Sequence, residues 1–75
     1  MNILVVGAGG REHAICWAIR KSTKCKNLYC VPGNAGIGEV ATCVNIGITD
    51  TEKIVTFSLE KNIDLVVIGP EDALV

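Results

Sequence analysis

Asn2-Ile3-Leu4-Val5-Val6-Gly7-Ala8-Gly9-Gly10 opens with a continuous apolar run and ends in a glycine-rich turn. An apolar run without polar alternation is typical of a strand covered on both faces, as in parallel sheets. Leu65-Val66-Val67-Ile68, which Gly69-Pro70 follows, repeats the pattern near the other end of the sequence. The two runs therefore predict two strands of a parallel sheet, each covered on both faces.

The segments between these runs complete an α/β pattern. Residues 27–31 and 43–48 are weaker strand candidates, and residues 11–22 and 51–62 are helix candidates. The resulting order β-α-β-β-α-β predicts a sheet with crossover helices.

Details of the two helices follow from their side chains. We expect the first helix to bury one apolar face made of Ala14, Ile15, Ala18 and Ile19. Asp50 is suited to cap the amino terminus of the second helix. Trp17 and Phe57, both at helical positions, are expected in the core.

Size and charge restrict the class of protein. The 75 residues carry a formal net charge of −1, and 49% of them are hydrophobic, which suits one small domain and argues against a disordered or nucleic-acid-binding chain. No apolar run approaches the roughly 20 residues that span a bilayer, and the first residues lack the basic region of a signal peptide. We therefore expect a cytoplasmic protein without nucleic-acid or membrane partners.

Four cysteines raise the question of a disulfide scaffold or a zinc site. Their spacing matches no pair of C-x-x-C ligands, and the only histidine lies elsewhere. We expect free, mostly buried thiols and no metal site; the cysteines are Cys16, Cys25, Cys30 and Cys43.

The last residues, 70–75, have the composition of the first turn of a helix. Proline comes first, two acids follow at the positive end of the helix dipole, and apolar residues come next. The helix body is absent from the sequence. We therefore expect residues 1–75 to be one domain that is incomplete at its carboxyl-terminal end, lacking about one helix and one strand.

Three loops are expected to leave the carboxyl ends of strands, where open parallel sheets bind ligands. They are residues 7–13, 32–36 and 69–71, and all three are rich in glycine, proline or polar residues. Their convergence on one edge of the sheet is a stronger indication of a ligand site than any one loop.

The first loop resembles the dinucleotide fingerprint G-x-G-x-x-G only in part. Gly7 and Gly9 fit, but Glu12 stands at the third glycine, and no acid follows the second strand. These departures disfavour NAD. A glycine turn opening a helix instead favours one compact anion such as a phosphate monoester, with Arg11 as a second donor and His13 in a neutral positioning role. The alternative is that the glycines only make the turn and that His13 is an ordinary surface or core residue.

The other two loops carry further candidate ligands. Asn34 in the second loop can cap or bind, and Glu71 in the third can accept hydrogen bonds from an amine or a ribose hydroxyl; a plain turn and a helix-terminal acid are the alternatives. No nucleophile–base pair, metal cluster or pair of catalytic carboxylates stands out, so no catalytic residue is assigned. The sequence indicates a substrate-holding module.

Together the three motifs resemble the phosphoribosylamine–glycine ligase family, also called glycinamide ribonucleotide synthetase, over all 75 residues. The resemblance is carried by Asn2 to Ala14 with its Gly-Gly-Arg-Glu-His-Ala motif, by Pro32-Gly33-Asn34-Ala35-Gly36, and by Asp64 to Glu71. Trp17 and the stretch 45–50 also fit. Asp72 and Ala73 depart from the family's pattern, which leaves open the geometry of that turn.

This resemblance implies a fold and an activity. Such ligases belong to the ATP-grasp superfamily and join 5-phosphoribosylamine to glycine with ATP and Mg²⁺ (or Mn²⁺) in de novo purine biosynthesis, through a glycyl acyl phosphate. Their N-terminal domain is Rossmann-like and similar to that of biotin carboxylase, and ATP is held by later domains. The chain would then be most of that domain, inactive alone, with no cofactor of its own; its partners would be the small-molecule substrates and the rest of the ligase.

The resemblance also implies which residues bind phosphoribosylamine. The edge at Gly9, Gly10 and Arg11 and the loop 32–36 would help to hold it, with Glu71 near the ribose or the amine. The full set of expected substrate-binding residues is Gly9, Gly10, Arg11, Glu12, His13, Pro32, Gly33, Asn34, Gly36, Gly69, Pro70 and Glu71. Three alternatives remain: a nucleotide- or dinucleotide-binding Rossmann module, the N-terminal domain of another ATP-grasp carboxylase or synthetase, and a non-enzymatic interaction module.

Overall fold

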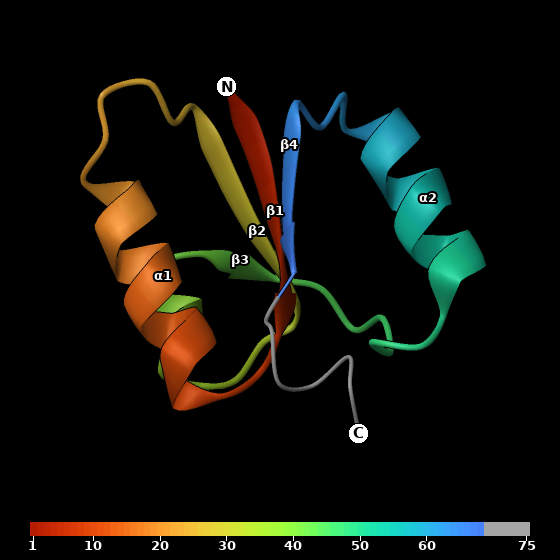
Figure 1. Cartoon of the computed structure of the whole chain (residues 1–75), viewed down its shortest axis with the longest axis horizontal. Helices are drawn as coiled ribbons and strands as arrows, with labels where there is room; N and C mark the ends of the chain where they lie inside the picture. The colour runs from red at the N-terminus through yellow and green to blue at the C-terminus, as the bar shows by residue number, and fades with distance from the viewer. Residues whose placement is uncertain (69–75) are drawn as a thin grey trace.

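The computed structural model describes residues 1–68 as a four-stranded sheet with helices on both faces (Figure 1). The sheet is parallel throughout and has the strand order β3-β2-β1-β4. This confirms the predicted α/β class and element order. The elements are β1 (Asn2–Gly7), α1 (Gly10–Arg20), β2 (Asn27–Pro32), the 3-10 turn η1 (Ile37–Glu39), β3 (Thr42–Cys43), α2 (Thr51–Glu60) and β4 (Leu65–Ile68).

Strand β1 lies in the middle of the sheet and is buried on both faces, as its unbroken apolar run predicts. Ile3 and Val5 belong to one core cluster, with Cys16 of α1, whereas Leu4 and Val6 belong to the other. The second cluster contains Phe57, which is buried as expected and meets the Tyr29 ring edge-on at 5.1 Å between centroids. Alternate residues of β1 thus pack against α1 on one face of the sheet and against α2 on the other face.

The prediction of a strand over residues 43–48 is wrong in its extent, because β3 covers only Thr42–Cys43. The Val44 N–H still donates to the Cys30 carbonyl at 2.9 Å, but the Ile46 N–H then donates to the Val44 carbonyl at 2.8 Å. A hydrogen bond between residues two apart folds the chain into a tight turn, so Val44 ends the pairing with β2.

The predicted apolar face of helix α1 is confirmed in part, since Ile15 and Ile19 are half-buried and pack against the core. The helix is rotated relative to the rest of that prediction: Glu12 and Cys16 are its buried residues, whereas Ala14 and Ala18 are exposed. Trp17 was expected in the core, but its side chain is 54% exposed, with the Lys21 ammonium 3.5 Å from the ring centroid. Adjacent positions of an α-helix point about 100° apart, so burying Cys16 turns Trp17 away from the sheet.

Helix α2 begins as predicted. The Asp50 carboxylate accepts a hydrogen bond from the Lys53 backbone N–H at 3.4 Å, and the Lys53 ammonium lies 3.6 Å from the other carboxylate oxygen. This confirms Asp50 as the N-cap.

The prediction that β4 is covered on both faces is wrong for the described residues. Leu65, Val66 and Ile68 are 45%, 41% and 60% exposed. Within residues 1–68, strand β4 pairs with β1 alone and so lies at the edge of the described sheet. A run of apolar letters does not indicate which strand takes an edge position.

The cysteines are free, as expected, but they are not all buried. Cys16 and Cys30 are buried, Cys25 is half-buried and Cys43 is exposed. Cys43 differs because it lies on the short edge strand β3.

Candidate functional site

The first two loops meet at the carboxyl edge of the sheet, which confirms that part of the predicted convergence. The Gly33 N–H donates to the Gly7 carbonyl at 3.2 Å, and the Asn34 side-chain amide donates to the Ala8 carbonyl. Residues 69–71 of the third loop lie outside the described residues. The strand before them ends at the same edge, because Ile68 is paired with Val6.

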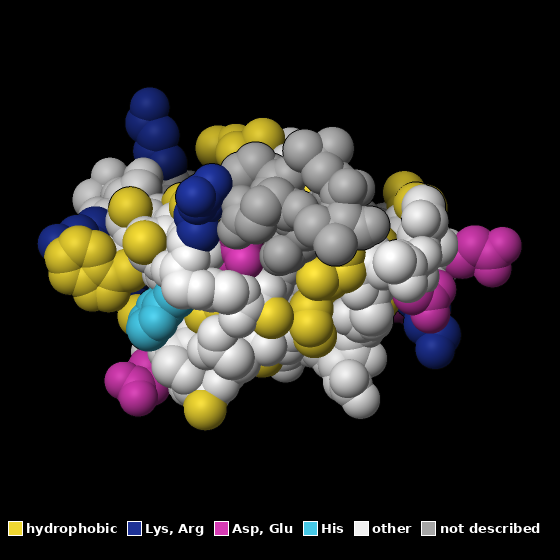
Figure 2. Space-filling view, turned by 60° about the horizontal axis from the view of Figure 1, so that its bottom comes forward, with side chains coloured by type: hydrophobic (Ala, Val, Ile, Leu, Met, Phe, Trp, Pro, Cys, Tyr) yellow, Lys and Arg dark blue, Asp and Glu magenta, His cyan; other side chains and the backbone are white. Residues whose placement is uncertain are grey.

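Figure 2 views the molecule towards this edge. Backbone and small or polar side chains make up much of the visible part of this face, and most of its acidic and basic side chains lie near the periphery. Much of this face thus consists of backbone and of side chains that are neither charged nor hydrophobic, with some hydrophobic side chains near its middle.

Helix α1 starts with amide groups that no side chain caps. Gly9 is the N-cap residue, and it has no side chain to accept a hydrogen bond from the first turn. The Gly9 carbonyl accepts the first helical hydrogen bond, from the His13 N–H, at 3.1 Å. Gly10 and Arg11, both exposed, stand at this positive end of the helix dipole, which favours an anion.

Glu12 lies beneath the glycine turn and is fully buried. One carboxylate oxygen, Oε1, accepts a hydrogen bond from the Gly9 N–H at 2.8 Å. The side chain also packs against Gly7, where a Cβ atom would lie 2.4 Å from the Glu12 Cγ. The structure thus places Glu12 inside the turn rather than on its surface, a position that sequence reasoning did not anticipate.

His13 joins α1 to the second loop. Its half-buried ring lies against Gly36, where a Cβ atom would be 3.0 Å from the ring carbon Cε1. With Gly10, Ala14 and Trp17 it lines a shallow depression of about 320 Å³ on the outer side of the helix. His13 therefore lies between the two loops and borders the depression beside them.

Asn34 organises the second loop. Its side-chain N–H donates to the Ala8 carbonyl, while its Oδ1 accepts a hydrogen bond from the Ile37 N–H at 2.9 Å. Before it, the peptide bond between Val31 and Pro32 is cis, and Gly33 has a φ of +70°. The Asn34 side chain thus holds the second loop against the first. Asn34 is also exposed, so it is accessible from solvent.

Replacing Asn34 by alanine should lower the free energy of unfolding by about 1–2 kcal/mol, since two side-chain hydrogen bonds are lost at a partly exposed position. Urea denaturation of the protein measures the change. Asn45→Ala is the matched control, because Asn45 is exposed and no side-chain hydrogen bond is described for it among residues 1–68, so its effect should stay within about 0.5 kcal/mol. Equal effects of the two substitutions would contradict the role of Asn34.

Two thiols also support the loops, which the sequence did not indicate. The Cys30 thiol donates to the Gly7 carbonyl at 3.3 Å, and the Cys43 thiol donates to the Asn34 carbonyl at 3.5 Å. The interaction with the neighbouring Cys16 thiol and then burial raise the pKa of Cys30 well above its usual range. Cys30 therefore stays protonated and remains a hydrogen-bond donor. Cys30 lies opposite Cys43 in the register of β2 and β3. Only that register, and not the sequence, shows that the two cysteines are neighbours.

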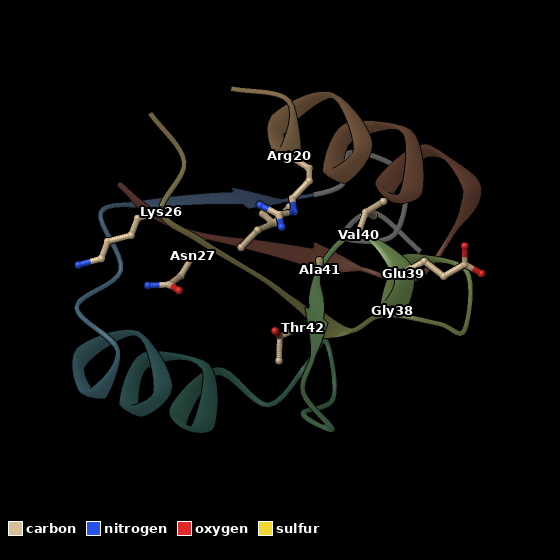
Figure 3. Close-up of a pocket in the computed structure, with 9 residues that line it drawn as sticks. Arg20, Lys26, Asn27, Gly38, Glu39, Val40, Ala41 and Thr42 are labelled. Atoms are coloured by element: carbon tan, nitrogen blue, oxygen red, sulfur yellow. The ribbon is translucent and has the colours of Figure 1, made fainter. Parts of the chain in front are cut away.

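A second pocket, of about 270 Å³, lies at the amino-terminal ends of β2 and β3 (Figure 3). The Arg20 guanidinium extends towards Thr42 across it, whereas Lys26 and Glu39 point away from its centre. None of the described residues predicted to bind substrate lines this pocket.

Residues 1–68 contain no group of three or more His, Cys, Asp or Glu side chains placed to hold a metal ion. Neither of their α-helices has the length and apolar character needed to cross a bilayer.

Comparison with known proteins gives a consistent result. The family described as "Phosphoribosylglycinamide synthetase, N domain" matches residues 1–75. Two bacterial proteins named phosphoribosylamine–glycine ligase, from Caldanaerobacter subterraneus and Mesorhizobium japonicum, are 51% and 52% identical over the whole chain, which spans 18% of each relative. The trifunctional purine biosynthetic protein adenosine-3 of Drosophila pseudoobscura is 46% identical over 97% of the chain, which spans 6% of that protein. The chain thus spans less than a fifth of the relatives it matches.

Proposed function

Because this chain belongs to the phosphoribosylglycinamide synthetase N-domain family, we propose that it is the phosphoribosylamine-binding part of an ATP-dependent ligase. That ligase joins 5-phosphoribosylamine to glycine in purine biosynthesis. The 75 residues are part of its N-terminal domain and are inactive alone. Identity of about 50% to bacterial ligases across the whole chain supports this assignment over another ATP-grasp enzyme.

The observation that carries the proposal is the uncapped start of α1 beside the loop 32–36. The phosphoribosylamine molecule has one phosphate monoester and a ribose that carries an amine. The first-turn amides and Arg11 suit the phosphate, and the polar loop held by Asn34 lies close enough to contact the sugar. Glu71 at the end of the third loop is the proposed acceptor for the amine or a ribose hydroxyl.

The remaining proposed substrate contacts follow the same edge. Gly9, Gly10, Glu12 and His13 shape or border the phosphate end. The conformation of the second loop depends on Pro32, Gly33 and Gly36. In the third loop, Gly69 and Pro70 come directly before Glu71.

ATP and Mg²⁺ are proposed to bind outside these residues. The Gly9 N–H, at the second glycine of the turn, is bound to Glu12 and so is not offered to the linked phosphates of a nucleotide, and residues 1–68 offer no cluster of metal ligands. The rest of the ligase chain would supply that site and ATP would supply the activation of glycine. The proposed partners are small-molecule substrates and the rest of the chain, and free thiols fit a cytoplasmic location.

Replacing Arg11 by alanine in the complete enzyme tests the proposal. Loss of a charge-assisted hydrogen bond to the substrate phosphate should raise the KM for phosphoribosylamine about tenfold or more and leave the KM for ATP nearly unchanged. Steady-state kinetics with each substrate varied in turn measures both constants.

Arg20→Ala is the matched control, because Arg20 is an exposed arginine at the opposite end of the same helix. Its substitution should leave both constants within about twofold. If Arg11→Ala raised both KM values equally, the proposed contact with the phosphate would be wrong.

A further inference from the structure

Glu12 takes the place where a dinucleotide fingerprint has its third glycine, and its carboxylate is fully buried. A glutamate at the third position of a helix reaches back to the N-cap amide when it forms half of a capping box. Here that amide is the Gly9 N–H, 2.8 Å from Oε1. The N–H group at the second glycine is therefore already bound inside the protein.

The second carboxylate oxygen, Oε2, is buried and has no hydrogen-bond partner among the described residues. A buried acceptor without a partner costs free energy, commonly about 1–3 kcal/mol, and such groups concentrate at functional sites. Its negative charge is not offset by a described ion pair, and it lies directly under the turn that an anion would approach.

The rest of the helix terminus remains open. Gly9 provides no side-chain cap, and Gly10 is exposed, with nothing within 4 Å of the place where its Cβ would be. One anionic group can therefore approach the first turn of α1. A second, linked phosphate would need the glycine turn itself, where the Gly9 N–H is occupied and the Glu12 carboxylate repels it.

We propose that Glu12 is a specificity-determining residue, which limits the site to ligands with a single phosphate and excludes diphosphates and dinucleotides. This inference rests on the proposed function, because it concerns the same phosphate end of the site. Glu12 acts by position: its side chain contacts Gly7 and Gly9 rather than the reacting atoms.

The experiment uses the complete ligase with inorganic phosphate and inorganic pyrophosphate as inhibitors. Inhibition is measured against varied phosphoribosylamine at saturating ATP and constant free Mg²⁺, so that effects at the ATP site are suppressed. In the wild type, phosphate should compete with phosphoribosylamine at lower concentrations than pyrophosphate does. The ratio of the two inhibition constants is the readout, because a general loss of stability would not change it in favour of one ion.

Two variants separate charge from hydrogen bonding. Glu12→Gln removes the charge but retains an oxygen for the Gly9 N–H, and it should shift the ratio at least fivefold towards pyrophosphate. Glu12→Gly also frees the Gly9 N–H and restores the third glycine, so its shift should be larger, at least tenfold. Glu52→Gln, at an exposed acid in the first turn of α2, should leave the ratio unchanged.

The outcomes distinguish this inference from the proposed function. If phosphate competes with phosphoribosylamine in the wild type but neither Glu12 variant shifts the ratio, the role of Glu12 is refuted and the substrate site stands. If phosphate does not compete in the wild type, the proposed phosphate site is refuted and the inference with it. Should Glu12→Gly fail to fold, the isosteric Glu12→Gln decides alone.

Discussion

Replacing Gly7 by alanine is expected to lower the free energy of unfolding by about 3 kcal/mol or more, because two costs combine. Gly7 has a φ of +145°, a conformation that residues with a Cβ rarely adopt. The new methyl group would also lie 2.4 Å from the Glu12 Cγ and 2.6 Å from its Cδ. Glu12 is fully buried, so its side chain cannot simply turn out into solvent to make room.

Gly10→Ala is the matched control for this prediction. Gly10 lies three residues further along the same motif, but it is the first residue of α1 and its Cβ would meet nothing within 4 Å. Alanine there should be neutral or stabilising by up to about 1 kcal/mol. Urea denaturation of both variants gives the comparison. If Gly7→Ala were as stable as Gly10→Ala, the packing of Glu12 under the turn would be wrong.

The elements with strong local signals were predictable from the sequence. The strand β1, the two helices and the cap at Asp50 each depend on residues that are neighbours along the chain. The exposure of β4 was not predictable, because it depends on the strand order of the whole sheet. The early end of β3 is different, because Asn45 at the centre of the turn after Val44 and Gly47 behind it are local turn signals that the strand prediction overlooked.

The place of the candidate site was predictable for a general reason, but its internal contacts were not. Parallel strands bring their carboxyl ends to one edge, so the loops after β1 and β2 had to meet. The rotation of α1 is a different matter. An apolar-face rule assigns Ala14 and Ala18 to the core and overlooks Glu12, because a glutamate is rarely buried without an ion pair.

That rotation explains why one motif serves both the fold and the site. Cys16 and Glu12, one helical turn apart, are buried on the same face of α1. This orientation places Glu12 under Gly7 and leaves Trp17 in solvent. The Gly9 N–H, which helix geometry alone would offer to a ligand, becomes part of the protein's own packing. This turn therefore offers fewer backbone N–H groups to a substrate than the glycine pattern alone indicates.

Gly33 in the second loop is also a position that requires glycine. Replacing Gly33 by alanine is expected to lower the free energy of unfolding by about 2–3 kcal/mol. Its φ of +70° lies in the left-handed region, which costs a residue with a Cβ about 1–2 kcal/mol. The added methyl group would also lie 2.3 Å from the Cys43 Sγ. That sulfur can move away only by rotating out of its hydrogen bond to the Asn34 carbonyl.

The two costs at Gly33 can be separated by a double-mutant cycle with Cys43→Ala. Removing the sulfur relieves the 2.3 Å contact but leaves the backbone strain and a tight contact of 3.1 Å with the Cβ of residue 43, so Gly33→Ala in the Cys43→Ala background should cost only about 1–2 kcal/mol. A coupling free energy near 1 kcal/mol, measured by urea denaturation, would show that β3 supports the loop through this thiol. Gly47→Ala serves as the control, since its Cβ would meet nothing within 4 Å. Strictly additive effects would mean that the sulfur contact has no energetic part in holding the loop, and that glycine is required at position 33 for other reasons, such as its backbone conformation.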